Sequence, residues 1–332
     1  MKRAIIIVLF VSVFTLAGGK NAAAHSSWVV IDADTGRMLI GSNENVRMPI
    51  ASLTKIWTAF TVLESGAPLG VTTISSAAAS AEGSSIYLQQ GVTADVEGLL
   101  YGLMLRSGND AAYALAEHAG GSIEGFIDLM NENALYFGLN DTVFTNPSGL
   151  HDEEHLSTAY ETALMLHYAM KNEKFKEIAS THNYTYEMNE ETYHWQNKHR
   201  MIHSDEYALA GKTGFTKVAG RTLATYFEKD DKKIIVVTLN DGNDWNTHRA
   251  LSAQVFSSYS LSTVAKKGTY QILPDVQGEL KEPIQLLLKK GEQKNLSNIV
   301  RIPRGKEPTS SGQWTVYYNN EPLVTKEIIL TQ

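Results

Sequence analysis

The sequence predicts an α/β (α+β) domain over residues 25–265, followed by a small all-β domain over residues 266–332. Three observations support this division. The chain is longer than a single typical hydrophobic core requires. Strand-like segments lie at both ends of the first part with helical segments between them, which indicates one sheet built from both ends and covered by helices. After about Lys266, short strand-like segments alternate with Gly, Pro and Lys.

The first part opens with two strand-like segments, residues 28–31 and 37–40, and the turn between them contains Asp and Gly. Pro49 then opens a helix. The apolar residues of this helix recur at spacings of three and four, as the helical period requires: Ile56, Trp57, Phe60 and Leu63. From residue 93 to residue 167 the apolar pattern is again helical.

Three further strand-like segments follow Tyr207, and an acidic turn joins the last two: residues 208–213, 222–227 and 234–239. A helix over residues 245–259 closes the first part. The all-β part has its clearest strands at residues 284–288 and 314–318.

Composition and charge exclude several classes of protein. The 29 Lys and Arg against 36 Asp and Glu give a net charge of −7. This charge disfavours nucleic acid as a partner, because phosphate contacts need clustered cations. The chain has no cysteine, so disulfides, thiolate metal sites and a cysteine nucleophile are excluded. The chemistry of this protein must therefore use oxygen and nitrogen groups.

The N-terminus predicts export. Residues 1–24 combine a cationic start, an apolar stretch over residues 4–16 and three alanines before residue 25. This is the pattern of a cleaved secretory signal peptide. The apolar stretch is shorter than the ~20 residues of a membrane-spanning helix, and an uncleaved N-terminal anchor is the alternative. We expect an extracellular or cell-wall-associated protein.

Ser52 and Lys55 form an S-x-x-K motif at the start of the helix that follows Pro49. Residues three apart lie one above the other on a helix face, so the hydroxyl and the amine are neighbours. Such a lysine activates a serine only if burial or a second cation lowers its pKa. The motif alone is weak, because about one match is expected by chance in a chain of this length.

Two further motifs strengthen this interpretation. Ser107 and Asn109 form S-x-N between two apolar helices, and Lys212-Thr213-Gly214 lies on a predicted strand. A lysine within an apolar strand is unusual, and the glycine allows a ligand or another backbone to approach closely. The order S-x-x-K, S-x-N, K-T-G is the signature of serine enzymes that act on penicillins and D-alanyl peptides.

With these motifs the chain resembles the low-molecular-weight penicillin-binding proteins, which are serine-type D-alanyl-D-alanine carboxypeptidases. The resemblance covers about residues 27–260 and continues into the β domain through residues 302–305 and 322–324. The residues around Ser107 are most similar to those of the Gram-positive, sporulation-associated branch of the family. The stretches that carry it are residues 50–56, 105–112, 145–150, 157–160 and 211–216. The family's fold would be a mainly antiparallel sheet covered by helices.

The resemblance also implies a mechanism, in which the last D-alanine is removed from peptidoglycan stem pentapeptides and β-lactam antibiotics act as covalent inhibitors. Ser52 would be the nucleophile that carries the acyl group, Lys55 the general base, and Ser107 the relay of the proton to the leaving amine. No metal or other cofactor is implied. The substrate-binding residues implied are Asn109, Lys212, Thr213, Gly214, Phe215 and Arg249, with the N–H groups of Ser52 and Phe215 as the oxyanion hole.

The chain departs from the family pattern at two positions that should border the cleft. Arg221 stands where a tyrosine is common, and His199 stands where an asparagine is usual. The family also tends to end in an amphipathic helix that lies on the membrane. Residues 328–332 are instead strand-like, which leaves peripheral contact with the membrane open.

Other functions were weighed against this one. Zinc binding is one alternative, because histidines occur four residues apart in two pairs: His199 with His203 and His151 with His155. However, no H-E-x-x-H motif is present. A Glu153-Glu154 pair could serve a β-lactamase, although solvated charge is the simpler interpretation. The same catalytic residues would also serve a D,D-endopeptidase that cleaves peptide cross-links. A β-lactam-sensing or wall-binding protein that does not turn over is the non-enzymatic alternative.

Overall fold

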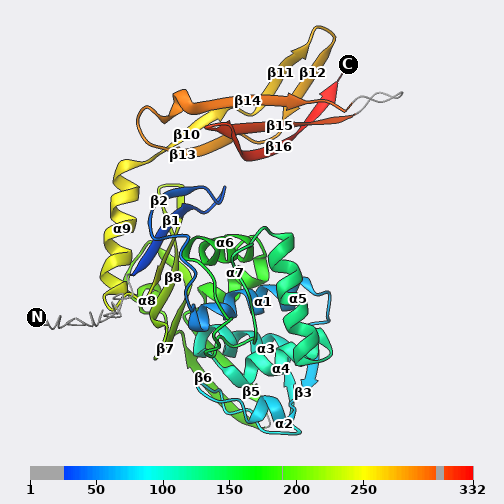
Figure 1. The fold of residues 1–332 in the computed structure, drawn as a ribbon. Coiled ribbons are helices and arrows are strands. Elements are labelled where there is room, and N and C mark those ends of the chain that lie inside the picture. The colour runs from blue at the N-terminus through cyan, green and yellow to red at the C-terminus, as the bar shows by residue number, and fades with distance from the viewer. Residues whose placement is uncertain (1–25, 189, 304–309, 332) are drawn as a thin grey trace, which may run out of the picture.

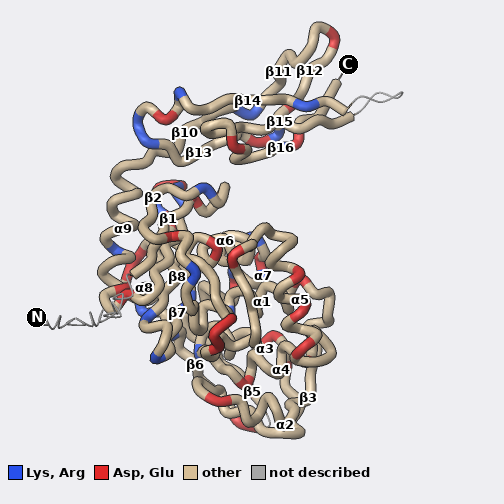
Figure 2. The backbone as a smooth tube through the Cα atoms, viewed as in Figure 1, with Lys and Arg blue, Asp and Glu red and all other residues tan. Residues whose placement is uncertain are grey.

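The computed structural model describes residues 26–188, 190–303 and 310–331. The predicted signal peptide, residues 1–24, lies outside the described residues. The described chain has two parts (Figure 1): a body of helices around a sheet, and a C-terminal part made of strands. Lys and Arg are interspersed with Asp and Glu along both parts (Figure 2).

The central sheet is built from both ends of the first part, as the sequence predicts. Its five strands are antiparallel to their neighbours and have the order β2-β1-β9-β8-β7. β1 pairs with β9 from Ser27 opposite Leu239 to Asp32 opposite Ile234. β7 is therefore an edge strand. The strands are β1 (Ser27–Asp32), β2 (Met38–Ser42), β7 (Ala208–Thr216), β8 (Gly220–Lys229) and β9 (Lys232–Leu239).

Helices cover both faces of this sheet because successive strand side chains point to opposite faces. Val29 and Ile31 belong to the core shared with the helical body, whereas Val30 between them belongs to a second core. α6 (Ala159–Ala169) packs against β1 and β9 on the first face. α9 (Asp244–Ser258) supplies Leu251 and Val255 to the second core.

The helical body surrounds α1 (Thr54–Glu64), which follows the short 3-10 helix η1 (Ala51–Leu53). Trp57 of α1 is fully buried, and its indole N–H donates to the Met130 carbonyl at 2.9 Å. The other elements of the body are α2 (Ser76–Ala79), α3 (Val96–Tyr101), the π-helical turn η2 (Gly102–Arg106), α4 (Asn109–Gly120), α5 (Ile123–Tyr136), α7 (Glu173–Ser180) and α8 (Arg200–Ser204).

Two small hairpins were not predicted. β3 (Val71–Thr73) pairs with β4 (Thr93–Asp95), so the stretch predicted as helical from residue 93 begins with a strand. β5 (Asn183–Met188) pairs with β6 (Glu191–Gln196). The helical prediction is also wrong for the loop between α5 and α6, which includes residues 145–158.

The C-terminal part consists of strands and one 3-10 turn. β10 pairs with β13, and five further strands form an antiparallel sheet of order β11-β12-β16-β15-β14. The sequence predicts the boundary after residue 265, which is the last residue of β10. Because β10 pairs with β13, it belongs to the C-terminal part. The elements are β10 (Ser260–Ala265), β11 (Gly268–Leu273), β12 (Val276–Leu280), β13 (Ile284–Leu288), η3 (Glu292–Asn295), β14 (Leu296–Arg301), β15 (Ser311–Tyr318) and β16 (Glu321–Thr331).

Arg37, in the turn between β1 and β2, connects the first part to the C-terminal part through three contacts. Its guanidinium donates to the Leu287 carbonyl at 2.9 Å, pairs with Glu292 at 2.9 Å and lies 3.9 Å from the centre of the Tyr318 ring. The pair with Glu292 is largely shielded from solvent. The predicted architecture, helices on a mainly antiparallel sheet followed by a β domain, is confirmed. Over the described ranges, no helix has the length and apolar character needed to cross a membrane.

Candidate active site

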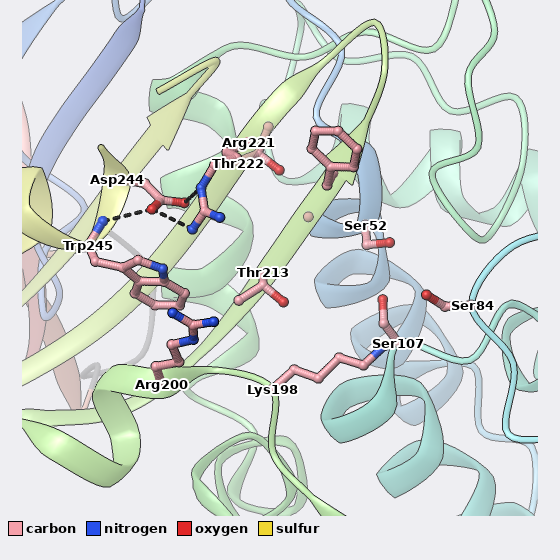
Figure 3. A pocket seen from close by; sticks show the side chains of 12 residues that line it. Ser52, Ser84, Ser107, Lys198, Arg200, Thr213, Arg221, Thr222, Asp244 and Trp245 are labelled. Carbon is pink, nitrogen blue, oxygen red and sulfur yellow. Dashed lines mark hydrogen bonds and ion pairs between the residues drawn. The ribbon is translucent and has the colours of Figure 1, made fainter. Parts of the chain in front are cut away.

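An open cavity of about 550 Å³ lies beside the edge strand β7. Ser52, Ser84 and Ser107 line one end of it (Figure 3). Thr213 of β7 lies in the middle, and the far end is lined by Arg200, Arg221, Asp244 and Trp245. The cavity thus collects residues from segments that are distant in sequence: η1, η2, β7, β8, α8 and α9.

Lys55 lies next to Ser52, which lines the cavity. Its side chain is fully buried in the first turn of α1. The amine hydrogen-bonds the Ser52 hydroxyl at 3.1 Å, the Asn109 side-chain oxygen at 2.7 Å and the Ser148 carbonyl. No salt bridge of Lys55 occurs among the described residues. The predicted neighbourhood of Ser52 and Lys55 is therefore present.

The Ser148 carbonyl was not predicted as a partner of Lys55. It is held in place by Asn146, whose side-chain oxygen accepts the backbone N–H groups of Ser148, Gly149 and Leu150 at 2.8–3.2 Å. Gly149 has a φ of +79°, and a Cβ there would lie 2.0 Å from the Ala51 carbonyl oxygen. Only glycine lets this loop pass so close to η1.

Ser107 and Asn109 bring the second motif to the same place. Ser107 ends the π-helical turn η2 with a left-handed φ of +65°, which is uncommon for a residue with a side chain. Asn109 donates from its side-chain nitrogen to the Glu82 carbonyl. This bond orients the amide so that its oxygen faces Lys55.

Lys212 completes the group from β7. Its buried amine donates to the Ser107 hydroxyl at 3.1 Å and to the Thr213 carbonyl at 2.7 Å. There are thus two serine–lysine pairs, Ser52 with Lys55 and Ser107 with Lys212, and both serines line the same end of the cavity. The three motifs that the sequence analysis combined are brought together.

The surroundings of the site lower the pKa of both lysine amines. Burial, and then the charges of Lys212 and Lys198, hold the pKa of the Lys55 amine well below its ordinary value of 10.5. Burial, and then the charge of Lys198, lowers the pKa of Lys212 to about 7. A lysine with a lowered pKa is able to act as a base near neutral pH.

Lys198 is a site residue that the sequence analysis did not select. Its backbone N–H donates to the Leu105 carbonyl at 3.1 Å, and its side chain extends toward Ser107 (Figure 3). The only available signal was its position beside His199 in a segment expected to border the cleft. A lysine preceding a helix carries no motif of its own.

Gly214 allows β7 to pass directly against the start of η1. A Cβ on Gly214 would lie 2.9 Å from the Ser52 backbone nitrogen and 2.4 Å from the Thr222 hydroxyl. Phe215 follows it, with a side chain that is 65% exposed and lines the cavity. The backbone of Ser52 and that of the K-T-G strand are therefore neighbours.

Arg249 was predicted in the site, and the structure does not place it there. It is exposed on α9, its nearest partner is Asn246 at 3.5 Å, and it lines a different cavity with Asp205. Its position on α9 turns it away from β7. Arg221 lies in the cavity instead.

Arg221 is rigidly held by an acid and an indole. Two of its nitrogens donate to the carboxylate of Asp244 at 2.7 and 3.1 Å, and its guanidinium lies 5.7 Å from the centre of the Trp245 ring. Asp244 is 2% exposed. This two-bond geometry is the specific one between Arg and carboxylates, so the guanidinium has a fixed direction.

His199, the other departure from the family pattern, lies behind the cleft wall. It is buried, and its Nε2 lies 2.9 Å from the Thr225 hydroxyl. Burial lowers the pKa of His199 to about 3, so the ring is neutral. Glu153 and Glu154 are exposed. Over the described part of the chain, no three His, Asp or Glu side chains gather as metal ligands.

Comparison with known proteins agrees with this geometry. A family model described as D-alanyl-D-alanine carboxypeptidase matches residues 15–243. The chain belongs to this family of serine peptidases. It is 33% identical over 309 residues to D-alanyl-D-alanine carboxypeptidase DacF of Bacillus subtilis, which covers 86% of this chain and 78% of that relative.

Two further proteins show how far the likeness extends within the carboxypeptidase family. The D-alanyl-D-alanine endopeptidase of Escherichia coli is 26% identical over 222 residues, which are 65% of this chain and 71% of that relative. The crystal structure of penicillin binding protein 5 from Haemophilus influenzae aligns with a TM-score of 0.73 at 22% identity, over 92% of this chain and 96% of that chain. The second likeness supports the shared fold, including the C-terminal part.

The close approach of Gly214 to the Ser52 nitrogen predicts that a methyl group added at residue 214 slows acylation of Ser52. In Gly214→Ala the Cβ would push β7 away from the Ser52 nitrogen, so acylation by labelled penicillin should slow about 100-fold or more. The measurement is the rate of label incorporation, with circular dichroism to verify the fold. Gly242→Ala, where a Cβ meets no atom within 4 Å, is the matched control. Equal rates in the two variants would refute the proposed role of this contact.

Proposed function

We propose that the protein is a serine D-alanyl-D-alanine carboxypeptidase that removes the last D-alanine from peptidoglycan stem peptides through an ester on Ser52. The observation that carries the proposal is the 3.1 Å hydrogen bond between the buried Lys55 amine and the Ser52 hydroxyl. Because the pKa of Lys55 is far below its ordinary value, the neutral amine accepts the serine proton.

Attack by the Ser52 oxygen on the carbonyl between the last two residues turns the carbonyl oxygen into an oxyanion. We assign the backbone N–H groups of Ser52 and Phe215 to its stabilisation, which the close approach of Gly214 to the Ser52 nitrogen supports. Each such donor is worth about 3 kcal/mol in other enzymes.

Breaking the C–N bond requires a proton on the leaving amine. We assign this transfer to Ser107, whose hydroxyl is hydrogen-bonded to Lys212. Lys55 takes the proton that leaves Ser52 and, in this proposal, passes it to Ser107 as Ser107 protonates the amine. D-alanine then departs and Lys55 is neutral again. A water molecule then attacks the ester with Lys55 again as the base, which frees the shortened peptide and restores Ser52. These steps balance without a metal or an organic cofactor.

The terminal carboxylate needs cations and a hydroxyl beside β7. Lys212, Thr213 and Arg221 meet this need, and we assign them to it. Arg221 takes the role that the sequence analysis gave to Arg249. Since Asp244 already fixes the guanidinium, the substrate would bind to a preformed site.

Two other activities share these residues. A D,D-endopeptidase would use the same acyl-enzyme, and it is favoured by the Escherichia coli relative of that name and by the continuation of the cavity past Thr213. A β-lactam-sensing protein would form the acyl group on Ser52 and not release it. Turnover of a D-Ala-D-Ala peptide separates the carboxypeptidase from both.

The proposal includes export, with the mature protein acting outside the cell on the wall. Its support is the signal-peptide pattern of residues 1–24. The partners would be stem peptides that end in D-Ala-D-Ala, with β-lactam antibiotics as covalent inhibitors of Ser52.

The proposed function predicts multiple-turnover release of free D-alanine from diacetyl-L-Lys-D-Ala-D-Ala. Ser52→Ala should lose this release completely, because the ester has no oxygen on which to form. The amount of D-alanine per enzyme is measured over time. Absence of release from protein that still binds labelled penicillin at Ser52 would refute the carboxypeptidase and leave the endopeptidase or the sensor.

Two arginines distinguish the observed site from the one expected from sequence. Arg221→Gln should raise KM for the D-Ala-D-Ala peptide about 10- to 100-fold, because a charge-assisted bond to the carboxylate is lost. Arg249→Gln should leave KM close to that of the unmodified protein. The measurement is KM of both variants by steady-state kinetics. A larger increase of KM in Arg249→Gln than in Arg221→Gln would contradict this assignment and favour Arg249 as the carboxylate ligand.

A further inference from the structure

The far end of the cavity is larger and more cationic than a terminal D-alanine requires. D-alanine presents one carboxylate and one methyl group. Beyond Thr213, however, the cavity continues to the indole of Trp245 and the guanidinium of Arg200 (Figure 3). Neither residue has a role in the proposed chemistry at Ser52.

The charge at this end is not balanced by the protein. Asp244 is the acid that lines the cavity, and Arg221 is paired with it at 2.7 Å. Arg200 is exposed at the start of α8, and its guanidinium has no ion pair or hydrogen bond within the described residues. The Arg200 guanidinium therefore remains available to a ligand, in addition to Arg221, which the proposed function assigns to the terminal carboxylate.

Trp245 lies between the two arginines in Figure 3. Two contacts hold it in place. Its backbone N–H donates to the Asp244 carboxylate at 2.8 Å, and its ring is nearly perpendicular to that of the buried His199 at a centroid distance of 5.4 Å. An indole held in this way offers a flat apolar surface to a chain of methylene groups.

The direction of the substrate follows from the roles assigned above. The attacked carbonyl lies at Ser52, and the carboxylate of the leaving residue lies at Thr213. In Figure 3, Trp245 and Arg200 lie beyond Thr213 as seen from Ser52. A side chain of the leaving residue that extends past its own carboxylate would therefore reach Trp245 and Arg200.

We infer that this end of the cavity is a subsite for leaving residues with a second carboxylate, in which Trp245 carries the methylene chain and Arg200 pairs with the distal carboxylate. The substrate class is peptides of the form acyl-D-Ala-X, where X is a D-amino acid with an acidic side chain. The reaction is the one proposed above, with X in place of D-alanine as the leaving amine. This inference rests on the proposed function and makes Arg200 a specificity-determining residue.

The test compares three peptides, diacetyl-L-Lys-D-Ala-X with X as D-Ala, D-Gln or D-Glu. D-Gln and D-Glu have the same size, so their ratio of kcat/KM reports the charge alone. At low ionic strength the protein should prefer D-Glu about three- to tenfold, and added salt should reduce the preference.

Arg200→Gln should abolish the preference for D-Glu over D-Gln, and Arg200→Lys should restore part of it. Arg249→Gln, an equal loss of charge on α9 outside the cavity, should retain it. A merely structural effect of Arg200 would change both peptides alike and leave the ratio intact.

The two proposals fail in different ways. If D-Ala is released from the first peptide but D-Glu is not preferred over D-Gln, the subsite is refuted and the carboxypeptidase stands. The subsite is also refuted if Arg200→Gln keeps the preference. If none of the three peptides is cleaved, both proposals fall.

Discussion

Two lysine amines buried side by side impose the constraint on which the active site depends. Lys55 and Lys212 are at most 1% exposed, and neither forms a salt bridge with any carboxylate of the described residues. Burying an unpaired charge is costly, so burial favours the neutral amine. The same cost that makes these lysines unfavourable for stability keeps Lys55 neutral as a base, whereas Lys212, whose pKa is lowered to about 7, is still partly charged near neutral pH. The site keeps them because the reaction needs a proton acceptor beside Ser52.

The surrounding elements are arranged to supply acceptors to these amines. The Asn109 amide faces Lys55 because its nitrogen is bound to the Glu82 carbonyl, and the Ser148 carbonyl faces it because Asn146 holds the loop. β7 carries Lys212 to Ser107 from the opposite side. Loss of any one acceptor would leave a buried donor unsatisfied, which costs about 1–3 kcal/mol. The loops and strands around the cavity are therefore coupled through these amines.

The sequence predicted the parts of this site that are fixed by local motifs. The strands, α1 and the pair Ser52–Lys55 follow from spacing and periodicity, and the resemblance places Ser107 and Lys212 in the same site. The hydrogen bond between Ser107 and Lys212 was not predicted. The expected position of Arg249 in the cavity differs from the observed one, because the direction of its side chain depends on how α9 is rotated against the sheet, and sequence periodicity does not give that rotation. The Ser148 carbonyl and Lys198 could not be found, since a backbone acceptor has no side-chain signal and an exposed lysine has no motif. The β5–β6 hairpin was missed because its pairing is settled by aromatic packing against the helical body.

The central claim, that the buried and neutral Lys55 amine drives the chemistry at Ser52, is tested most directly by titrating the two buried amines. The protein would carry lysine labelled with ¹³C at Cε, and the chemical shifts would be followed by NMR from pH 5 to 11, with Lys55→Met and Lys212→Met to assign the two resonances. The account predicts that both amines have a pKa clearly below the ordinary 10.5, with that of Lys212 near 7. If both resonances titrate at 10 or above, the amines are protonated at neutral pH, and Lys55 is not the base that activates Ser52.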